Sequence, residues 1–131
     1  MKKILSRVAV GAGTVAMATV MGVGPASAGN ALIYAQKTEW TGNILHFASM
    51  NWYANGDSWK VCDLWNDGKK AVGEVMWSDP GGSWRLATEA NSTGGTVCKT
   101  GSRNVWENEQ LTIRIFIGNQ EYANSTKVTA S

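Results

Sequence analysis

Histidine is nearly absent from this chain, and the one that occurs has no nucleophile beside it. The 131 residues contain a single histidine, His46, together with two cysteines and two prolines. No serine or cysteine stands in a recognisable motif with His46, and the chain has neither a G-x-S-x-G elbow nor a phosphate-binding P-loop. We therefore expect a protein that is not an enzyme and that needs no cofactor.

The sequence also has few groups that could bind a metal ion. One histidine and two cysteines cannot form a conventional zinc site when the cysteines are joined to each other. Asp63, Asp67, Gly68 and Glu74 match positions 1, 5, 6 and 12 of a calcium-binding EF-hand loop. Position 3 is Trp65, which cannot supply the required oxygen, so we expect no metal site.

Without its N-terminal segment, the chain has almost no surplus of charge of either sign. Lys2, Lys3 and Arg7 precede a charge-free stretch rich in Ala, Val and Gly, and residues 25–28 read Pro-Ala-Ser-Ala, an A-x-A cleavage site. The apolar run is too short for the roughly 20 residues of a spanning helix. We expect residues 1–28 to be a removed secretory signal and residues 29–131 to form one extracellular domain.

Removal of these three cations leaves nine basic residues against ten acidic ones in the exported part. Such a nearly neutral chain has no basic surplus for binding nucleic acid or an anionic bilayer, so we expect neither partner. Its cysteines, Cys62 and Cys98, would meet an oxidising environment, and a structural disulfide is the default interpretation. The 37-residue loop from Cys62 to Cys98 corresponds to about 3.8 kcal/mol of chain entropy.

Long stretches of helical periodicity are absent as well. Short runs rich in Val, Ile, Thr and aromatic residues alternate with turn clusters, which is the pattern of an all-β domain, and seven or eight such strands indicate an antiparallel β-sandwich. In the strand from Leu111 to Gly118, the residues Leu111, Ile113, Ile115 and Ile117 share one face. The expected strands are Ala31–Gln36, Ile44–Tyr53, Trp59–Trp65, Lys70–Ser78, Trp84–Ala90, Val97–Thr100, Leu111–Gly118 and, if there are eight, Ser125–Thr129.

The segment around Asp67-Gly68 is interpreted as a hairpin turn, and two registers are open. In a two-residue loop, Cys62 pairs with Gly73, and the tryptophans of the first strand share a face with charged residues. In a three-residue loop with a bulge at Gly68, those tryptophans share an apolar face, which separates charge better and is preferred. That preferred apolar face contains Trp59, Val61, Trp65, Ala71, Gly73, Val75 and Trp77.

The segment from Gly56 to Val75 contains a G-D-x-W-x-V-x-D sequence, a D-G turn and a V-G-E-V strand. Over roughly residues 56 to 100 the chain resembles small exported Streptomyces-type proteins, mostly of unassigned function, and the signal resembles those of filamentous actinobacteria. This resemblance implies a β-sandwich. The spacing of Trp77 after Cys62 also resembles an immunoglobulin domain in part, although Cys98 comes early for the second cysteine of that fold.

The chain is also similar to the small adaptor subunit of umbrella toxin particles, a secreted protein that bridges a lectin and a toxin-bearing stalk; no diagnostic motif marks it here. Such a resemblance implies a subunit of an extracellular bacterial complex. We therefore expect a secreted non-enzymatic protein-interaction module. The alternatives are a carbohydrate-binding module, suggested by seven tryptophans, and a small antimicrobial or enzyme-inhibitor protein.

Aromatic residues are the candidates for a binding surface. Tyr34 and Trp40 lie near the N-terminus of the exported part, where burial in the domain's own core is least assured. The segment from Ala31 to Gln36 is either the domain's first strand or an arm that adds to a partner's sheet. The expected binding residues are Tyr34, Trp40, Trp59 and Trp65.

Overall fold

The computed structural model describes residues 29–79 and 81–131, and every regular element in them is a β-strand. The secretory signal expected for residues 1–28 lies outside the described residues. No helix in the described part of the chain is long and apolar enough to cross a membrane. The eight strands are β1 (Ala31–Thr38), β2 (Ile44–Tyr53), β3 (Ser58–Asp63), β4 (Ala71–Asp79), β5 (Gly82–Ala90), β6 (Val97–Ser102), β7 (Gln110–Ile117) and β8 (Glu121–Thr129).

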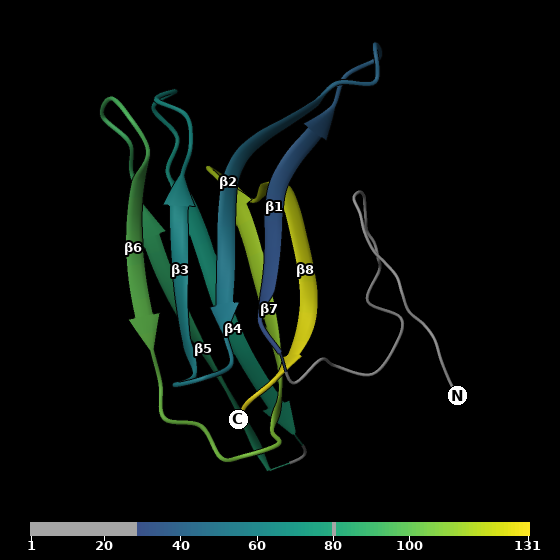
Figure 1. Ribbon diagram of the computed structural model, residues 1–131, viewed down its shortest axis with the longest axis vertical. Coiled ribbons are helices and arrows are strands. Elements are labelled where there is room, and N and C mark those ends of the chain that lie inside the picture. Colours follow the sequence, from purple (N-terminus) through teal and green to yellow (C-terminus); the bar gives the residue numbers. More distant parts are fainter. Residues whose placement is uncertain (1–28, 80) are drawn as a thin grey trace.

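These strands form two four-stranded antiparallel sheets, one in the order β1-β2-β3-β6 and the other in the order β5-β4-β7-β8. The sheets lie face to face, so the predicted single-domain β-sandwich is confirmed (Figure 1). The loops after β1, β3, β5 and β7 all lie at the end drawn uppermost, which we call the upper end. The loops after β2, β4 and β6 and the C-terminus lie at the lower end.

The core lies between the sheets and is built from alternate residues of each strand. On β7 the four residues expected on one face, Leu111, Ile113, Ile115 and Ile117, are all buried. They face Met50 and other inward residues of the first sheet, within one continuous apolar cluster. A period of two places every second side chain between the sheets, and that is why these runs form strands with one buried face.

The expected hairpin between β3 and β4 is wrong in both registers. Strand β3 pairs with β2 and β6, whereas β4 pairs with β5 and β7, so the turn around Asp67-Gly68 crosses from one sheet to the other. The apolar face of the preferred register is nevertheless mostly buried, because Trp59, Val61 and Val75 all point into the core. Alternation shows which side chains point inward and cannot distinguish a paired strand from one stacked across the sandwich.

Close packing across the sandwich explains a glycine in β4. A Cβ atom at Gly73 would collide with Cγ2 of Val61 and lie 3.0 Å from Sδ of Met50. Both contacts come from the opposite sheet, where Val61 belongs to β3 and Met50 to β2. Gly73 therefore allows the two sheets to approach each other at this point.

The disulfide between Cys62 and Cys98 is confirmed. The two cysteines are direct partners in the β3–β6 pair, with a Cα–Cα distance of 4.0 Å. The bond therefore fastens the edge strand β6 to its neighbour within one sheet. In an immunoglobulin domain the disulfide joins the two sheets, and the strand order of the sheets differs from the order seen here. The resemblance to an immunoglobulin domain therefore does not extend to the topology.

The carboxylate of Asp63 is buried, and no cationic side chain among the described residues forms an ion pair with it. Its Oδ2 accepts a 2.8 Å hydrogen bond from the backbone N–H of Ser92, and its Oδ1 accepts a longer one of 3.4 Å from the N–H of Trp65. These contacts satisfy much of the carboxylate's hydrogen-bonding capacity. They also tie the loop after β5 to the end of β3, so Asp63 orders the upper end of the sandwich.

Candidate functional site

The described residues show no convergence of reactive side chains. His46 is exposed on β2 and stacks on Tyr34, with 3.9 Å between the ring centroids and 12° between the ring planes. No group of three or more His, Cys, Asp or Glu side chains within residues 29–79 and 81–131 is arranged to hold a metal ion. Exposed aromatic side chains are therefore the candidates for a binding site.

The seven tryptophans occupy three kinds of position. Trp52 and Trp59 are buried in the core, and Trp77 and Trp84 are half-buried at the lower end, where they pair across β4 and β5. The remaining three are on loops. Their exposed fractions are 97% for Trp40, 83% for Trp106 and 42% for Trp65.

Two of the four expected binding residues are exposed. Trp40 and Trp65 lie at the upper end, in the loops after β1 and β3. Trp59 is 2% exposed, so its assignment to a binding surface is wrong: it points inward from β3 and its Nε1 donates a 2.8 Å hydrogen bond to Oγ1 of Thr88 in the other sheet. Tyr34 is half-buried under the stack with His46.

The N-terminal segment is the domain's own first strand. Residues Ala31–Thr38 pair with β2 along their whole length, and Ile33 and Ala35 are buried in the core. The carbonyl of Tyr34 also accepts a 3.2 Å hydrogen bond from the side-chain amide of Asn124, which joins β1 to β8 across the sandwich edge. The interpretation as an unattached binding arm is therefore wrong for this strand.

The hairpin tip, which we define as Glu39–Ile44, places Trp40 outside the sandwich. The N–H of Gly42 donates to the carbonyl of Glu39 at 2.8 Å, and the N–H of Glu39 donates to the carbonyl of Asn43 at 2.7 Å. Gly42 has a φ of 94°, which favours glycine and closes a short hairpin loop with a bulge. Trp40 is at the corner of this turn, where its side chain cannot reach the core.

The hairpin tip has more apolar surface than Trp40 alone. Ile44, opposite Thr38 at the start of β2, is 46% exposed, and Leu45 beside it is half-buried. In Figure 1 the loop between β1 and β2 extends beyond the other loops of the upper end. The tip is thus an ordered projection with an exposed tryptophan at its corner and further apolar residues at its base.

The second aromatic group at the upper end is a cluster of Phe47, Trp65 and Tyr122. Phe47 stacks on Tyr122 with a centroid distance of 4.8 Å and contacts Trp65 in a tilted geometry at 4.9 Å. Phe47 is the extra residue of a bulge between β1 and β2 and is nearly buried, whereas Tyr122 is 40% exposed. The cluster covers the core at this end and presents the outer parts of two rings.

A polar contact lies beside this cluster. Nζ of Lys69 is 2.7 Å from Oε1 of Glu121, and this hydrogen bond, followed by the charge of Glu121, raises the pKa of Lys69 above its ordinary value of 10.5. Asp67 and Tyr122 act on Lys69 in the same direction. Both partners are solvent-exposed, so the pair adds little to stability and mainly positions the two side chains.

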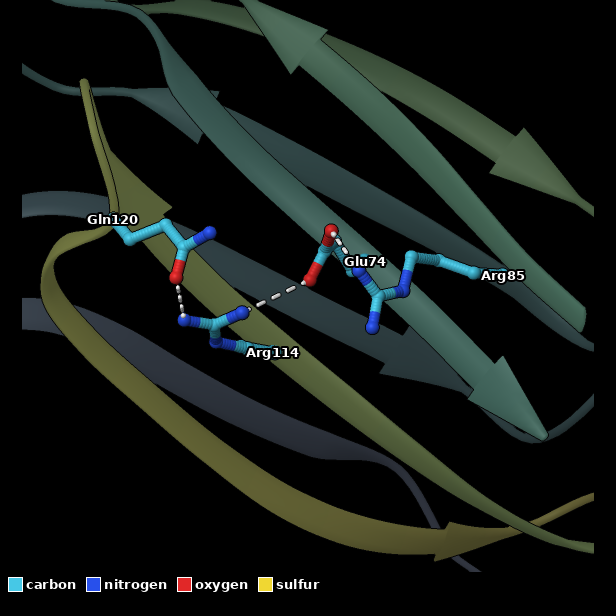
Figure 2. Close-up of polar contacts among 4 residues, drawn as sticks. All are labelled: Glu74, Arg85, Arg114 and Gln120. Atoms are coloured by element: carbon cyan, nitrogen blue, oxygen red, sulfur yellow. Dashed lines mark hydrogen bonds and ion pairs between the residues drawn. The ribbon is translucent and has the colours of Figure 1, made fainter. Parts of the chain in front are cut away.

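The outer face of the second sheet has a separate charge network (Figure 2). Glu74 on β4 is nearly buried between two arginines, with Arg114 Nη1 at 3.3 Å and Arg85 Nη1 at 3.6 Å. Arg114 also donates to Oε1 of Gln120 at 2.8 Å and lies over the ring of Phe116. Because Glu74 already has cationic partners from both neighbouring strands, this network stabilises the sheet.

Sequence reasoning missed the exposure of Ile44, Tyr122 and Trp106. Ile44 belongs to the predicted strand Ile44–Tyr53, where alternation favours inward placement of large apolar side chains, whereas Tyr122 precedes the predicted strand Ser125–Thr129. Trp106 stands among Asn104, Glu107 and Asn108, a polar context that indicates a loop. That context was a usable signal for its exposure, whereas no local signal distinguished the other two.

No family model, no curated protein and no solved structure matches the chain.

Proposed function

We propose that this protein is a secreted, non-enzymatic interaction module that binds another extracellular protein through its hairpin tip. The observation that favours this function is the 97% exposed side chain of Trp40 on an ordered turn. A tryptophan in this position contributes nothing to the domain's own core. In protein interfaces the same side chain is among the commonest hot spots.

The order of the turn supports binding. Two backbone hydrogen bonds and the left-handed Gly42 restrict the loop before any partner arrives. A restricted loop loses less conformational freedom on binding than a disordered one, so more of the contact energy remains as affinity. Ile44 and Leu45 extend the apolar contact beside Trp40.

The charges around the tip favour a protein over an anionic bilayer. Lys37 and Glu39 next to the turn balance each other, and the exported part as a whole has nine basic and ten acidic residues. Binding to an anionic membrane surface usually needs a cluster of basic residues beside the inserted aromatic residue. The tip has no such cluster in its sequence, whereas a concave apolar pocket on a protein needs none.

An adaptor role within a larger complex is the specific form of this proposal. The resemblance of residues 56–100 to exported Streptomyces-type proteins supports release into the medium. The resemblance to the adaptor of umbrella toxin particles supports a toxin complex as the setting. The absence of convergent reactive side chains in the described residues suits a subunit that connects other proteins.

Affinity capture from the native culture medium tests the proposal. Tagged protein with the natural sequence, Trp40→Ala and Trp106→Ala are each used as bait, and bound proteins are identified by mass spectrometry. Trp106 is the matched control because it is equally a loop tryptophan but lies at the lower end among polar residues. We expect a secreted protein that is retained by the natural sequence and by Trp106→Ala and lost with Trp40→Ala.

The same experiment can contradict the proposal in two ways. Equal recovery of every bound protein by the natural sequence and Trp40→Ala would place the contact elsewhere. Selective loss with Trp106→Ala would move the interface to the lower end. Circular dichroism of all three proteins checks that neither substitution changes the fold.

A further inference from the structure

A pocket of about 310 Å³ opens at the upper end, between the loop after β3, the end of β5 and the turn after β7. It is shallow, and its volume is at the lower limit of ordinary small-ligand sites. It is separate from the hairpin tip, none of whose residues lines it. The main lining residues are Gly68, Lys69, Lys70, Asn91, Asn119 and Glu121.

Backbone contacts hold the walls of this pocket in place. The N–H of Gly118 donates to the carbonyl of Lys70 at 3.0 Å, which joins the turn after β7 to the loop after β3. Next to Asn91, the N–H of Ser92 donates to the buried carboxylate of Asp63 at 2.8 Å. Three segments that are far apart in the sequence are thereby fixed before a ligand binds.

The side chains of the pocket offer donors and acceptors in a balanced set. Within the described residues, the amides of Asn91 and Asn119 make no hydrogen bond to another group of the chain, so they are available to a ligand. Lys69 is paired with Glu121 at 2.7 Å, and Lys70 is paired with Glu89 at 2.9 Å. The pocket therefore presents amide groups and neutralised ion pairs, with little net charge.

Two aromatic residues are close in sequence to lining residues, but neither of them lines the pocket. Tyr122 directly follows the lining residue Glu121, and Trp65 is in the same loop as Gly68 and Lys69. Tyr122 has a φ of 54°, which is unusual for a bulky residue, at an irregularity in the β7–β8 pairing. Such bulges change the direction in which a side chain points. Here the ring of Tyr122 stacks on Phe47 and remains partly exposed.

We propose that this pocket binds a neutral saccharide unit. Sugar hydroxyls are both donors and acceptors, and they match the amides and the paired lysine and glutamate side chains of the lining. An anionic ligand would compete with Glu121 and Glu89 for both lysines. An apolar ligand would find no large apolar side chain among the lining residues.

Nuclear magnetic resonance titration of 15N-labelled protein, secreted from the full-length coding sequence, tests this proposal. The neutral probes are N-acetylglucosamine tetramer, cellotetraose and mannotetraose, each added up to about 20 mM, the range of weak binding. Trigalacturonate and inorganic phosphate serve as anionic probes. We expect at least one neutral probe to shift the side-chain amide signals of Asn91 and Asn119 in a saturable manner.

Variants separate this site from the proposed protein interface. The double substitution Asn91→Ala with Asn119→Ala is expected to weaken saccharide binding at least about tenfold, or ~1.4 kcal/mol. Asn104→Ala, an exposed asparagine near the lower end, and Trp40→Ala are expected to bind the saccharide normally. If the double variant loses saccharide binding but still captures the partner protein, the pocket and the protein interface are separate sites. The two proposals can therefore fail independently.

Three results would overturn the saccharide proposal. The first is no saturable shift with any neutral probe. The second is a preference for trigalacturonate or phosphate, which would identify an anion site. The third is undiminished binding by the double variant, which would place the saccharide elsewhere.

Discussion

The buried pair Trp52–Trp59 and the exposed Trp40 show two opposite uses of the same side chain. Trp52 and Trp59 are direct partners across β2 and β3, with ring planes 10° apart and centroids 6.3 Å apart. Trp40 lies in a turn only 12 positions before Trp52 and is 97% exposed. A high tryptophan content in a small domain therefore indicates residues of the core as much as residues of a binding surface.

Backbone position decides which use applies. The indoles of Trp52 and Trp59 leave the strands on the side that faces the second sheet, and Gly101 of β6 provides room for the ring of Trp59, whose Nε1 would lie 2.5 Å from an added Cβ. Trp40 is at the corner of a turn closed by Gly42, where no side of the loop faces the core. The comparison predicts that substitutions at the two places have separable effects.

The largest effect is expected at Trp59. Trp59→Ala removes a fully buried indole and leaves a cavity and an unpaired Thr88 hydroxyl, which should lower the free energy of unfolding by about 3–5 kcal/mol. Trp40→Ala should change it by less than about 0.5 kcal/mol. Urea denaturation followed by circular dichroism measures both. Similar losses of unfolding free energy for the two variants would contradict the contrast between a buried and an exposed tryptophan.

Loss of the disulfide is expected to have the second-largest effect on stability. Replacing Cys62 and Cys98 by serine, or reducing the bond, should destabilise the domain by about 2–4 kcal/mol. The bond lies on the β6 side of the sheet, far along the sheet order from β1 and the hairpin tip, so partner capture should persist while the domain stays folded. Thermal melting with and without reductant measures the loss. The serine variant is its control, because its melting temperature should not respond to reductant.

Gly73→Ala tests the close approach of the sheets that buries Trp59 and its neighbours. An added methyl group collides with Val61, so we expect a loss of about 1–3 kcal/mol by overpacking. Gly94→Ala is the matched control, since nothing lies within 4 Å of its added Cβ and its φ is outside the left-handed region. Equal unfolding midpoints for the two variants would show that the sheets are not tightly packed at this point.

The smallest effect is expected from the exposed pair Lys69–Glu121. The pKa of Lys69 is raised above 10.5 by Glu121, so the pair's contribution is present below that pH and is lost as the pH rises through the raised value. Unfolding of the natural sequence and of Glu121→Gln should differ slightly at pH 7 and converge in strongly alkaline solution. A difference that grows with pH would contradict this assignment.

Alternation and the cysteine count predicted seven or eight strands, the inward face of β7 and the disulfide, because both can be read directly from the sequence. The pairing of β3 and β4 was not predictable in the same way. Two strands with apolar faces satisfy the same pattern whether they pair or stack across the sandwich. The exposure of Trp40 was predicted from its position near the start of the domain. The assignment of Trp59 to a binding surface depended on a β3–β4 hairpin that does not occur.

The central claim is that Trp40 contacts a secreted partner, and photo-crosslinking from that position tests it most directly. A photoreactive phenylalanine analogue replaces Trp40 in one protein and Trp106 in another, and each is irradiated in native culture medium. The account predicts a discrete crosslinked protein from position 40 and none from position 106. A crosslink from position 106 alone, or none from position 40 in medium that contains the captured partner, would contradict it.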